Sequence, residues 1–154
     1  NMESGEEKEL YQTKVLVELD YPSLSPDGQQ LAFEVTTWSY QENQEELFQL
    51  MIMPVGGGTP RELLRSKKYL HDISWMRDSQ HVLIVRESES GPPQLWSVPL
   101  DGNEPQPSGL SMFGLHSVSV HPDGRRIAFY GQEESHEEVW VIKNLLSAPK
   151  PSRK

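Results

Sequence analysis

Short runs of apolar residues recur along the chain, and turn residues separate them. The runs at 31–35, 82–86 and 127–130 are each four or five residues long and rich in Val, Ile, Leu and Phe. Runs of this length are typical of β-strands, because an amphipathic helix repeats its apolar positions over about 10 residues or more. The pattern therefore predicts an all-β chain.

The runs belong to a sequence repeat. Residues 49–84 align with residues 94–129 at a spacing of 45 without a gap, and His71 falls on His116 in this alignment. Residues 25–33 form a further partial copy, because Ser-Pro-Asp-Gly-Gln-Gln-Leu-Ala-Phe matches His-Pro-Asp-Gly-Arg-Arg-Ile-Ala-Phe. Four short strands in about 45 residues are typical of one blade of a β-propeller.

Each unit is predicted to contain four strands, with a tight turn between the first and the second. Pro-Asp-Gly favours a tight turn, because proline presets φ, aspartate bonds back to the backbone and glycine accepts a left-handed conformation. The innermost strands are expected at 22–25, 73–76 and 118–121, and the outermost strands near 59–65 and 104–110.

The motifs Ser-Pro-Asp-Gly-x-x-Leu/Ile-Ala-Phe, Leu-Trp-x-Val and Gly-Gly-x-x-Pro resemble the blade repeat of the TolB-like β-propeller repeat family, whose blades are WD40-like. The resemblance covers roughly residues 15–146, and two of the three copies keep the Pro-Asp-Gly turn. It implies an architecture more than an activity, since related propellers serve as periplasmic envelope proteins, sensor domains and gating domains of peptidases.

The repeat predicts a domain division. We expect a disordered N-terminal tail at 1–12, a three-blade segment at 13–146 and a C-terminal tail at 147–154. The blades are placed at roughly 21–65, 72–110 and 117–146. The third blade has no outer strand of its own, so residues 13–19 are assigned as a closing outer strand that pairs with residues 138–142.

Three four-stranded blades are expected to be half of a six-bladed propeller. Known propellers have about four to eight blades, and an open stack exposes the apolar faces of its terminal blades. One hypothesis is a homodimer, in which two chains form a six-bladed ring. The other is that further blades of a longer chain complete the ring.

The candidate binding residues are expected on one face of the propeller. This face carries the loops between successive blades and the loops between the second and third strands of each blade. Asp20, His71 and His116 precede the three innermost strands and are expected to surround the mouth of the axial channel. Trp38 and Tyr40 lie in a lengthened loop of the first blade, where exposed aromatic residues are typical binding anchors. Alternatively, the first three side chains hydrogen-bond neighbouring loops, and the two aromatic residues pack within a hairpin.

The loops that follow the second strand of each blade are acidic. A negative face favours a cationic partner, although solvated loop glutamates are also common. These glutamates are Glu42, Glu45, Glu46, Glu87, Glu89, Glu133, Glu134 and Glu137.

Composition narrows the function classes. The net charge of −9 disfavours nucleic-acid binding, and the absence of cysteine excludes disulfides and thiolate chemistry. No apolar run has the roughly 20 residues that a membrane helix needs, so we expect no membrane insertion. Neither Gly-x-Ser-x-Gly nor His-Glu-x-x-His is present.

We therefore expect a non-catalytic protein- or ligand-binding module without a cofactor, as a sensor or a periplasmic interaction domain. The alternative is a gating or accessory propeller of a hydrolase or peptidase. The resemblance implies a periplasmic or extracytoplasmic location, while the composition fits the cytoplasm equally well.

Overall fold

The computed structural model describes residues 7, 9–13, 17–38, 46–133 and 136–144, which form three antiparallel sheets in chain order. The first sheet has the order β1 (Glu18–Leu24), β2 (Gln30–Thr37), β3 (Leu47–Pro54) and β4 (Arg61–Ser66). The second has β5 (Leu70–Trp75), β6 (His81–Arg86), β7 (Gln94–Pro99) and β8 (Gln106–Ser111). The third has β9 (Phe113–Val120), β10 (Arg126–Glu133) and β11 (His136–Lys143).

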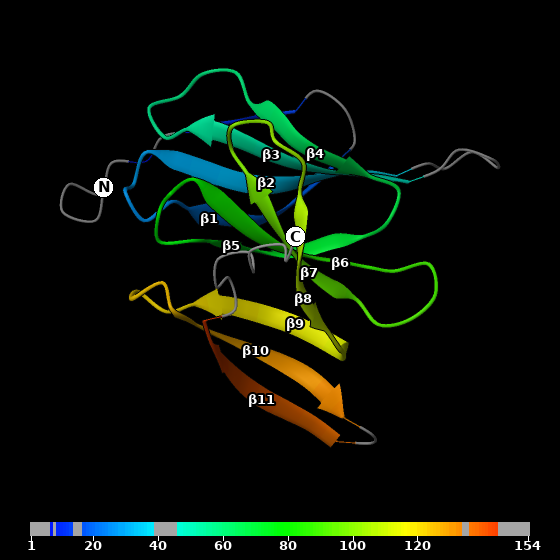
Figure 1. The fold of residues 1–154 in the computed structure, drawn as a ribbon. Helices are drawn as coiled ribbons and strands as arrows, with labels where there is room; N and C mark the ends of the chain where they lie inside the picture. The colour runs from blue at the N-terminus through cyan, green and yellow to red at the C-terminus, as the bar shows by residue number, and fades with distance from the viewer. Residues whose placement is uncertain (1–6, 8, 14–16, 39–45, 134–135, 145–154) are drawn as a thin grey trace, which may run out of the picture.

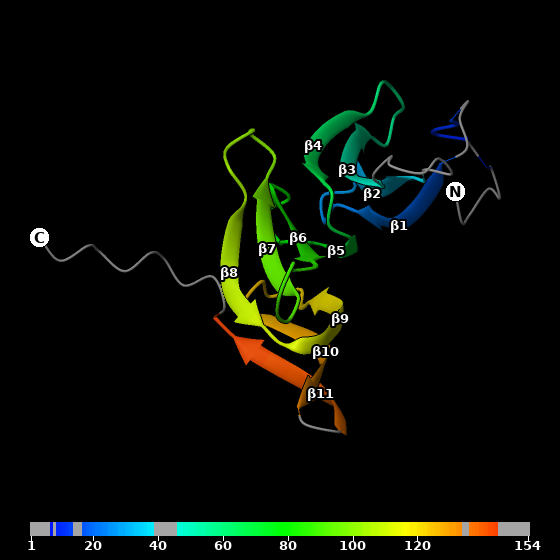
Figure 2. The same ribbon diagram turned by 90° about the vertical axis from the view of Figure 1, so that its right-hand side faces the viewer.

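The sheets are consecutive blades, and the expected all-β propeller fold is confirmed. Figure 1 shows them as successive layers, and Figure 2 shows the same order after a quarter turn. The outermost strands predicted near 59–65 and 104–110 are β4 and β8. The described part of the third sheet has three strands, and the residues after 144 lie outside the described part of the chain.

The sheets pack through alternate side chains of their central strands. Ala32 and Ile52 of the first sheet lie in one core with Val82 and Ile84 of the second. Because side chains of a strand alternate between its two faces, the neighbouring residues on β6 face the third sheet. Leu83 and Val85 accordingly share a second core. Its members from the third sheet are Leu115, Val118, Ile127 and Phe129.

The tryptophans inside the strands pack between the sheets, as their repeat positions indicate. Trp75 is buried in the first of these cores, and Trp96 packs at its edge. Trp140 packs against the second core. The indole nitrogen of Trp75 also donates a hydrogen bond to the carbonyl oxygen of Ser23 at 2.8 Å, which ties the second blade to the first.

Two residues of the segment expected to be a disordered tail at 1–12 pack against the first sheet, while residues 1–6 and 8 lie outside the described part of the chain. Leu10, Tyr11 and Val17 pack against the outer face of the first sheet. The rings of Tyr11 and Phe33 lie 5.4 Å apart between centroids. The face carries large apolar side chains, so their burial under these residues is favourable.

Two boundaries of the predicted blades need correction. Glu18 and Leu19, assigned to a closing outer strand at 13–19, belong instead to β1, where they pair with Thr36 and Val35 of β2. The innermost strands therefore begin earlier than expected, because β2 is long enough to pair with residues that precede the predicted start. Residues 14–16 and the predicted C-terminal tail at 147–154 lie outside the described part of the chain.

The third sheet presents an apolar outer face. Tyr130 of β10 pairs with Val139 of β11, and Ala128 pairs with Val141. The exposed fractions of Tyr130, Val139 and Val141 are 41%, 65% and 60%. The corresponding faces of the first two sheets are covered by the blade that follows.

Candidate functional site

The three innermost strands share a β-bulge at the same repeat position. Pairing with the second strand shifts register between Asp20 and Ser23 and between His71 and Ser74. The equivalent part of the third sheet, around His116, is also shifted. Asp20, His71 and His116 thus lie inside β1, β5 and β9, and the expectation that they precede these strands is wrong.

The bulges have a left-handed residue immediately after each candidate side chain. The φ angles are 53° at Tyr21, 58° at Asp72 and 56° at Ser117. A left-handed conformation is unfavourable for residues with a Cβ atom, and bulges commonly redirect side chains near functional sites. The same strained conformation occurs at all three blades, so it is a property of the repeat.

A buried carboxylate faces the bulge of the first blade. Glu34 of β2 pairs with Asp20 of β1, and its side chain is only 1% exposed. The hydroxyl of Thr36 donates to Glu34 Oε1 at 2.9 Å, while Oε2 has no hydrogen-bond partner among the described atoms. Burial raises the pKa of Glu34 to about 7, the Thr36 hydrogen bond opposes this rise, and Asp20 adds to it.

The sequence prediction did not include Glu34, although the repeat contains a signal. The equivalent positions in the other copies are Val85 and Tyr130. A glutamate at a position that packs toward the next blade is exceptional, since buried carboxylates are rare without a partner. Comparison of the copies could therefore have identified it.

Aromatic side chains lie beside this carboxylate. The hydroxyls of Tyr21 and Tyr69 are hydrogen-bonded at 2.9 Å. Tyr69 stacks on His71, with centroids 5.2 Å apart, and meets Phe48 edge-on at 5.3 Å. Burial, the hydrogen bond with Tyr21 and the negative charges of Glu34 and Asp20 raise the pKa of Tyr69.

His71 is held between acidic neighbours. Its Nδ1 lies 2.7 Å from Asp72 Oδ2, and its Nε2 lies 3.5 Å from Glu87 Oε1. Only 8% of the surface of His71 is exposed. His71 and Asp20 both act electrostatically on Glu34, so two of the expected site residues are near one another.

Trp38 lies at the end of β2 on the same side of the first blade. Its Nε1 donates to Glu18 Oε2 at 2.9 Å, and 40% of its surface is exposed. Glu18 in turn contributes with burial to a raised pKa of Asp20. Tyr40, the other aromatic candidate, lies outside the described residues.

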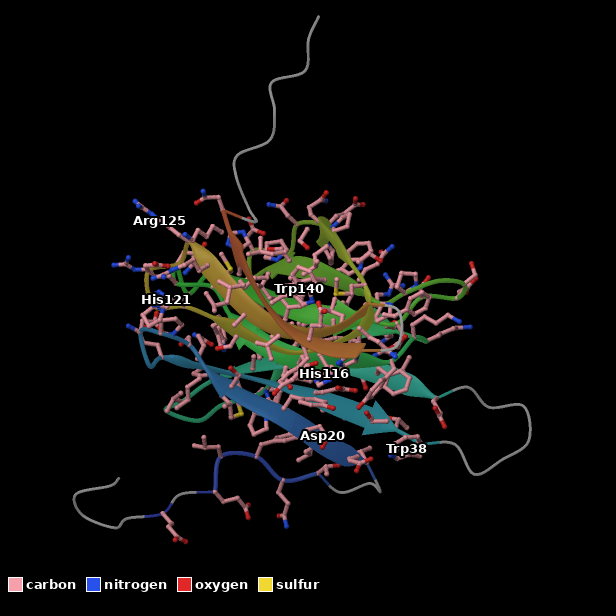
Figure 3. The ribbon with its side chains drawn as sticks, turned by 90° about the horizontal axis from the view of Figure 1, so that it is seen from below. Asp20, Trp38, His116, His121, Arg125 and Trp140 are labelled. Atoms are coloured by element: carbon pink, nitrogen blue, oxygen red, sulfur yellow. The ribbon has the colours of Figure 1, made fainter. Side chains whose placement is uncertain are left out.

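His116 has a different environment in the third sheet. Its ring stacks on Tyr130, with centroids 4.9 Å apart and planes at 6°, and its Nδ1 contacts Ser117 Oγ at 3.0 Å. Figure 3 shows Asp20, Trp38 and His116 toward one end of the sheets and His121 and Arg125 at the other. His116 thus shares the end of the sheets with the other candidates but contacts an aromatic ring.

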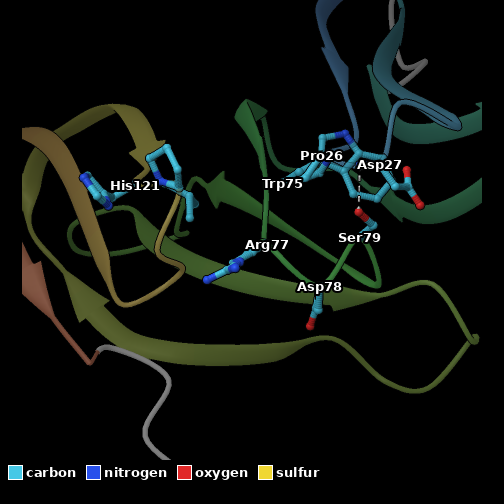
Figure 4. Close-up of a pocket in the computed structure, with 9 residues that line it drawn as sticks. Pro26, Asp27, Trp75, Arg77, Asp78, Ser79 and His121 are labelled. Carbon is cyan, nitrogen blue, oxygen red and sulfur yellow. Dashed lines mark hydrogen bonds between the residues drawn. The ribbon is translucent and has the colours of Figure 1, made fainter.

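The opposite end of the sheets contains a pocket of about 610 Å³. The first turns of all three blades line it, with Asp27 and Ser79 on one side and His121 on the other (Figure 4). The backbone N–H of Asp27 donates to Ser79 Oγ at 3.2 Å. Arg77 replaces the proline of the other two turns and extends across the pocket (Figure 4). The sequence prediction did not include this pocket, because it placed binding at the other face.

The described residues contain no group of three or more His, Asp or Glu side chains arranged to hold a metal ion. They also form no helix long and apolar enough to cross a membrane.

Comparison with known proteins gives relatives in sequence and in fold. No family model matches the chain. The Tol-Pal system protein TolB of Anaeromyxobacter dehalogenans is 28% identical over 95 residues, which cover 62% of this chain and 21% of that protein. The match thus spans about a fifth of the relative's length.

Solved structures share the fold at low sequence identity. TolB from Acinetobacter baumannii has a TM-score of 0.64 at 19% identity, covering 78% of this chain and 29% of that one. The β-propeller domain of the Trilobed protease from Pyrococcus furiosus has a TM-score of 0.64 at 14% identity, covering 83% and 39%. The blade repeat, the packed sheets and the TolB relative together show that this chain has a β-propeller fold and is similar to TolB-like propeller proteins.

Proposed function

We propose that the chain is a non-catalytic, protein-binding propeller module whose binding face is the end of the sheets that carries Asp20, Trp38 and His71. The observation that carries the proposal is the bulge repeated in all three innermost strands. Each bulge keeps a left-handed non-glycine residue beside a candidate side chain. Strained backbone of this kind costs about 1–3 kcal/mol per residue and is concentrated at functional sites.

The chemistry of this face suits a protein partner. Trp38, Tyr69 and Tyr21 are 40%, 40% and 37% exposed, and each carries a polar group at the edge of an apolar ring. Exposed tyrosine and tryptophan are the residue types that most often supply binding energy at protein interfaces.

A second function is favoured by the likeness to the Trilobed protease propeller. In this alternative the chain is a gating or accessory propeller of a hydrolase or peptidase, and the catalytic residues belong to another domain. The same face would then meet the catalytic domain. We also propose an extracytoplasmic location, in line with the similarity to TolB.

The ring is completed, in our proposal, by a second chain or by further blades of a longer chain. The exposed Val139 and Val141 support either form, because each requires a blade on the outer face of the third sheet. In both forms the segment containing Leu10 and Tyr11 has to leave the first sheet, since a preceding blade would occupy its place.

Light scattering distinguishes the two forms. A homodimer has twice the 17.6 kDa mass of one chain, and V141D on the outer face of the third sheet should return it to the single mass. A single mass for the unmodified chain at all concentrations would contradict the homodimer.

Site-specific photocrosslinking tests the binding face. A benzophenone amino acid is placed at Trp38 and, as the control, at Asn103, an exposed residue in the turn between β7 and β8. In cells of the source organism, we expect a discrete protein adduct at position 38 and none at position 103. Adducts confined to position 103, or equal at both, would contradict the proposed face.

A further inference from the structure

We propose that the first blade binds a basic side chain of the partner, a lysine ammonium or an arginine guanidinium, at an acidic–aromatic site. This inference rests on the proposed function and names the chemistry of its ligand. The acidic–aromatic site consists of Glu18, Asp20, Tyr21, Glu34, Trp38 and Tyr69.

The first observation is the unsatisfied carboxylate oxygen of Glu34. Thr36 occupies only Oε1, and Oε2 has no hydrogen-bond partner among the described atoms although the side chain is 1% exposed. A buried carboxylate without a full set of partners is costly, and a nearby cation offsets this cost. A cationic ligand would therefore gain more at Glu34 than at a solvated glutamate.

The second observation is the sign of the surrounding charge. Asp20 and Glu18 both raise the pKa of Glu34, and among the neighbouring charges only His71 lowers it. His71 itself lies close to the carboxylates of Asp72 and Glu87, which add two further acidic groups beside it. The local excess of negative charge attracts a cation and repels a carboxylate or phosphate.

The third observation is the aromatic boundary. Trp38 and Tyr69 each expose 40% of their surface, and Trp38 is fixed by its hydrogen bond to Glu18. Ammonium and guanidinium groups bind favourably over aromatic faces within about 6 Å of the ring centroid. Aromatic rings contribute no such term to a hydrated divalent metal, which needs several converging oxygen or nitrogen ligands. The combination thus favours an organic cation.

The position of the site agrees with this assignment. Asp20 belongs to the bulge of β1, and Trp38 follows the end of β2, so the charged and aromatic groups come from adjacent strands of one blade (Figure 3). In the third blade the positions equivalent to Asp20 and Glu34 are occupied by His116 and Tyr130, whose rings stack on each other. We therefore expect the first blade to recognise the basic group.

Titration with a short peptide tests the proposal on the full 154-residue chain. The probe is Ac-Gly-Gly-Lys-Gly-Gly-NH₂, and its matched control carries acetyl-lysine. Binding is followed by the NMR resonance of the Trp38 indole N–H, assigned with W38F. We expect the lysine peptide to shift this resonance and the acetyl-lysine peptide to bind at least threefold more weakly.

Substitutions of the acidic residues test whether the lysine binds at this site. D20N and E18Q should each weaken lysine-peptide binding at least threefold, while E104Q, which removes an equal charge in the turn between β7 and β8, should leave it unchanged. Circular dichroism confirms folding, and E18Q keeps the test valid if D20N does not fold. Equal loss in all three variants would indicate general charge attraction and overturn the proposal.

Proton release provides an independent readout. A cation bound beside Glu34 favours its ionised form, so binding at pH 7 should release up to about half a proton, measured by calorimetry in buffers of different ionisation enthalpy. E34Q should abolish this release. Equal binding of both peptides would overturn the cation assignment while leaving the binding face intact. If neither peptide binds and position 38 gives no photocrosslink, both proposals fail.

Discussion

Replacement of Glu34 by glutamine should make the protein more stable at neutral and alkaline pH. Folding raises the pKa of Glu34 from 4.5 to about 7, chiefly through burial. Between these values the folded chain keeps a proton that the unfolded chain releases. The free energy of unfolding of the wild-type protein therefore falls as pH rises through this window.

The magnitude follows from the size of the pKa change. One pKa unit corresponds to about 1.4 kcal/mol, so a rise from 4.5 to about 7 would cost about 3 kcal/mol at pH 8 without solvent screening. Screening and local relaxation reduce this value, and we expect a cost of about 1–2 kcal/mol. Glutamine has nearly the same shape and stays neutral, so E34Q removes the cost while it keeps the packing.

Urea denaturation at pH 4, 6 and 8 measures the effect. E34Q and the wild-type protein should have similar stability at pH 4, and the variant should be more stable at pH 8. E62Q is the control of opposite sign, because the Arg65 hydrogen bonds lower the pKa of Glu62 and its stabilisation is present only above acidic pH. A difference between E34Q and wild type that does not change with pH would refute the reasoning.

Three further substitutions test the packing and the bulges. S117G should stabilise the chain by about 0.5–1 kcal/mol, because φ at Ser117 is 56° and glycine adopts this conformation without strain. S119G, in the same strand, is the control and should destabilise the chain by a similar amount. Thermal melts that rank the two variants in reverse would contradict the bulge. W75F should cost about 2 kcal/mol in urea, because it leaves the partly buried carbonyl oxygen of Ser23 without its donor, and no loss would show that this contact is unimportant. In the single chain, where Leu10 and Tyr11 pack on the first sheet, Y11A should cost about 1 kcal/mol and increase binding of an apolar dye to this sheet, and an unchanged dye signal would argue that Tyr11 does not cover this face.

The sequence predicts the blades well because their signals are local. Short apolar runs define the strands, and Pro-Asp-Gly defines the turn between the first and second strands in two of the three copies, so both are visible without knowledge of the tertiary contacts. The outermost strands at β4 and β8 follow from the same repeat. The packing of Trp75 between blades also follows, since its position is a strand position in every copy.

The missed features depend on contacts between distant segments. The bulges at Asp20 and His71 arise from pairing with a longer second strand, and no turn residue indicates them. The packing of Tyr11 against Phe33 of the first sheet is a contact between segments distant in the sequence, which no local pattern indicates. Glu34 could have been identified from the sequence by comparing the equivalent positions of the three copies, but the apolar pattern of one strand alone does not indicate it.

The bulge shared by the three innermost strands places the candidate side chains at one end of the sheets. Solution NMR measures it directly through the amide-to-α-proton distance within one residue, which is short when φ is positive. We expect strong intraresidue cross-peaks at Tyr21, Asp72 and Ser117, and weak ones at their strand neighbours. Weak cross-peaks at all three positions would show ordinary extended strands and contradict the site.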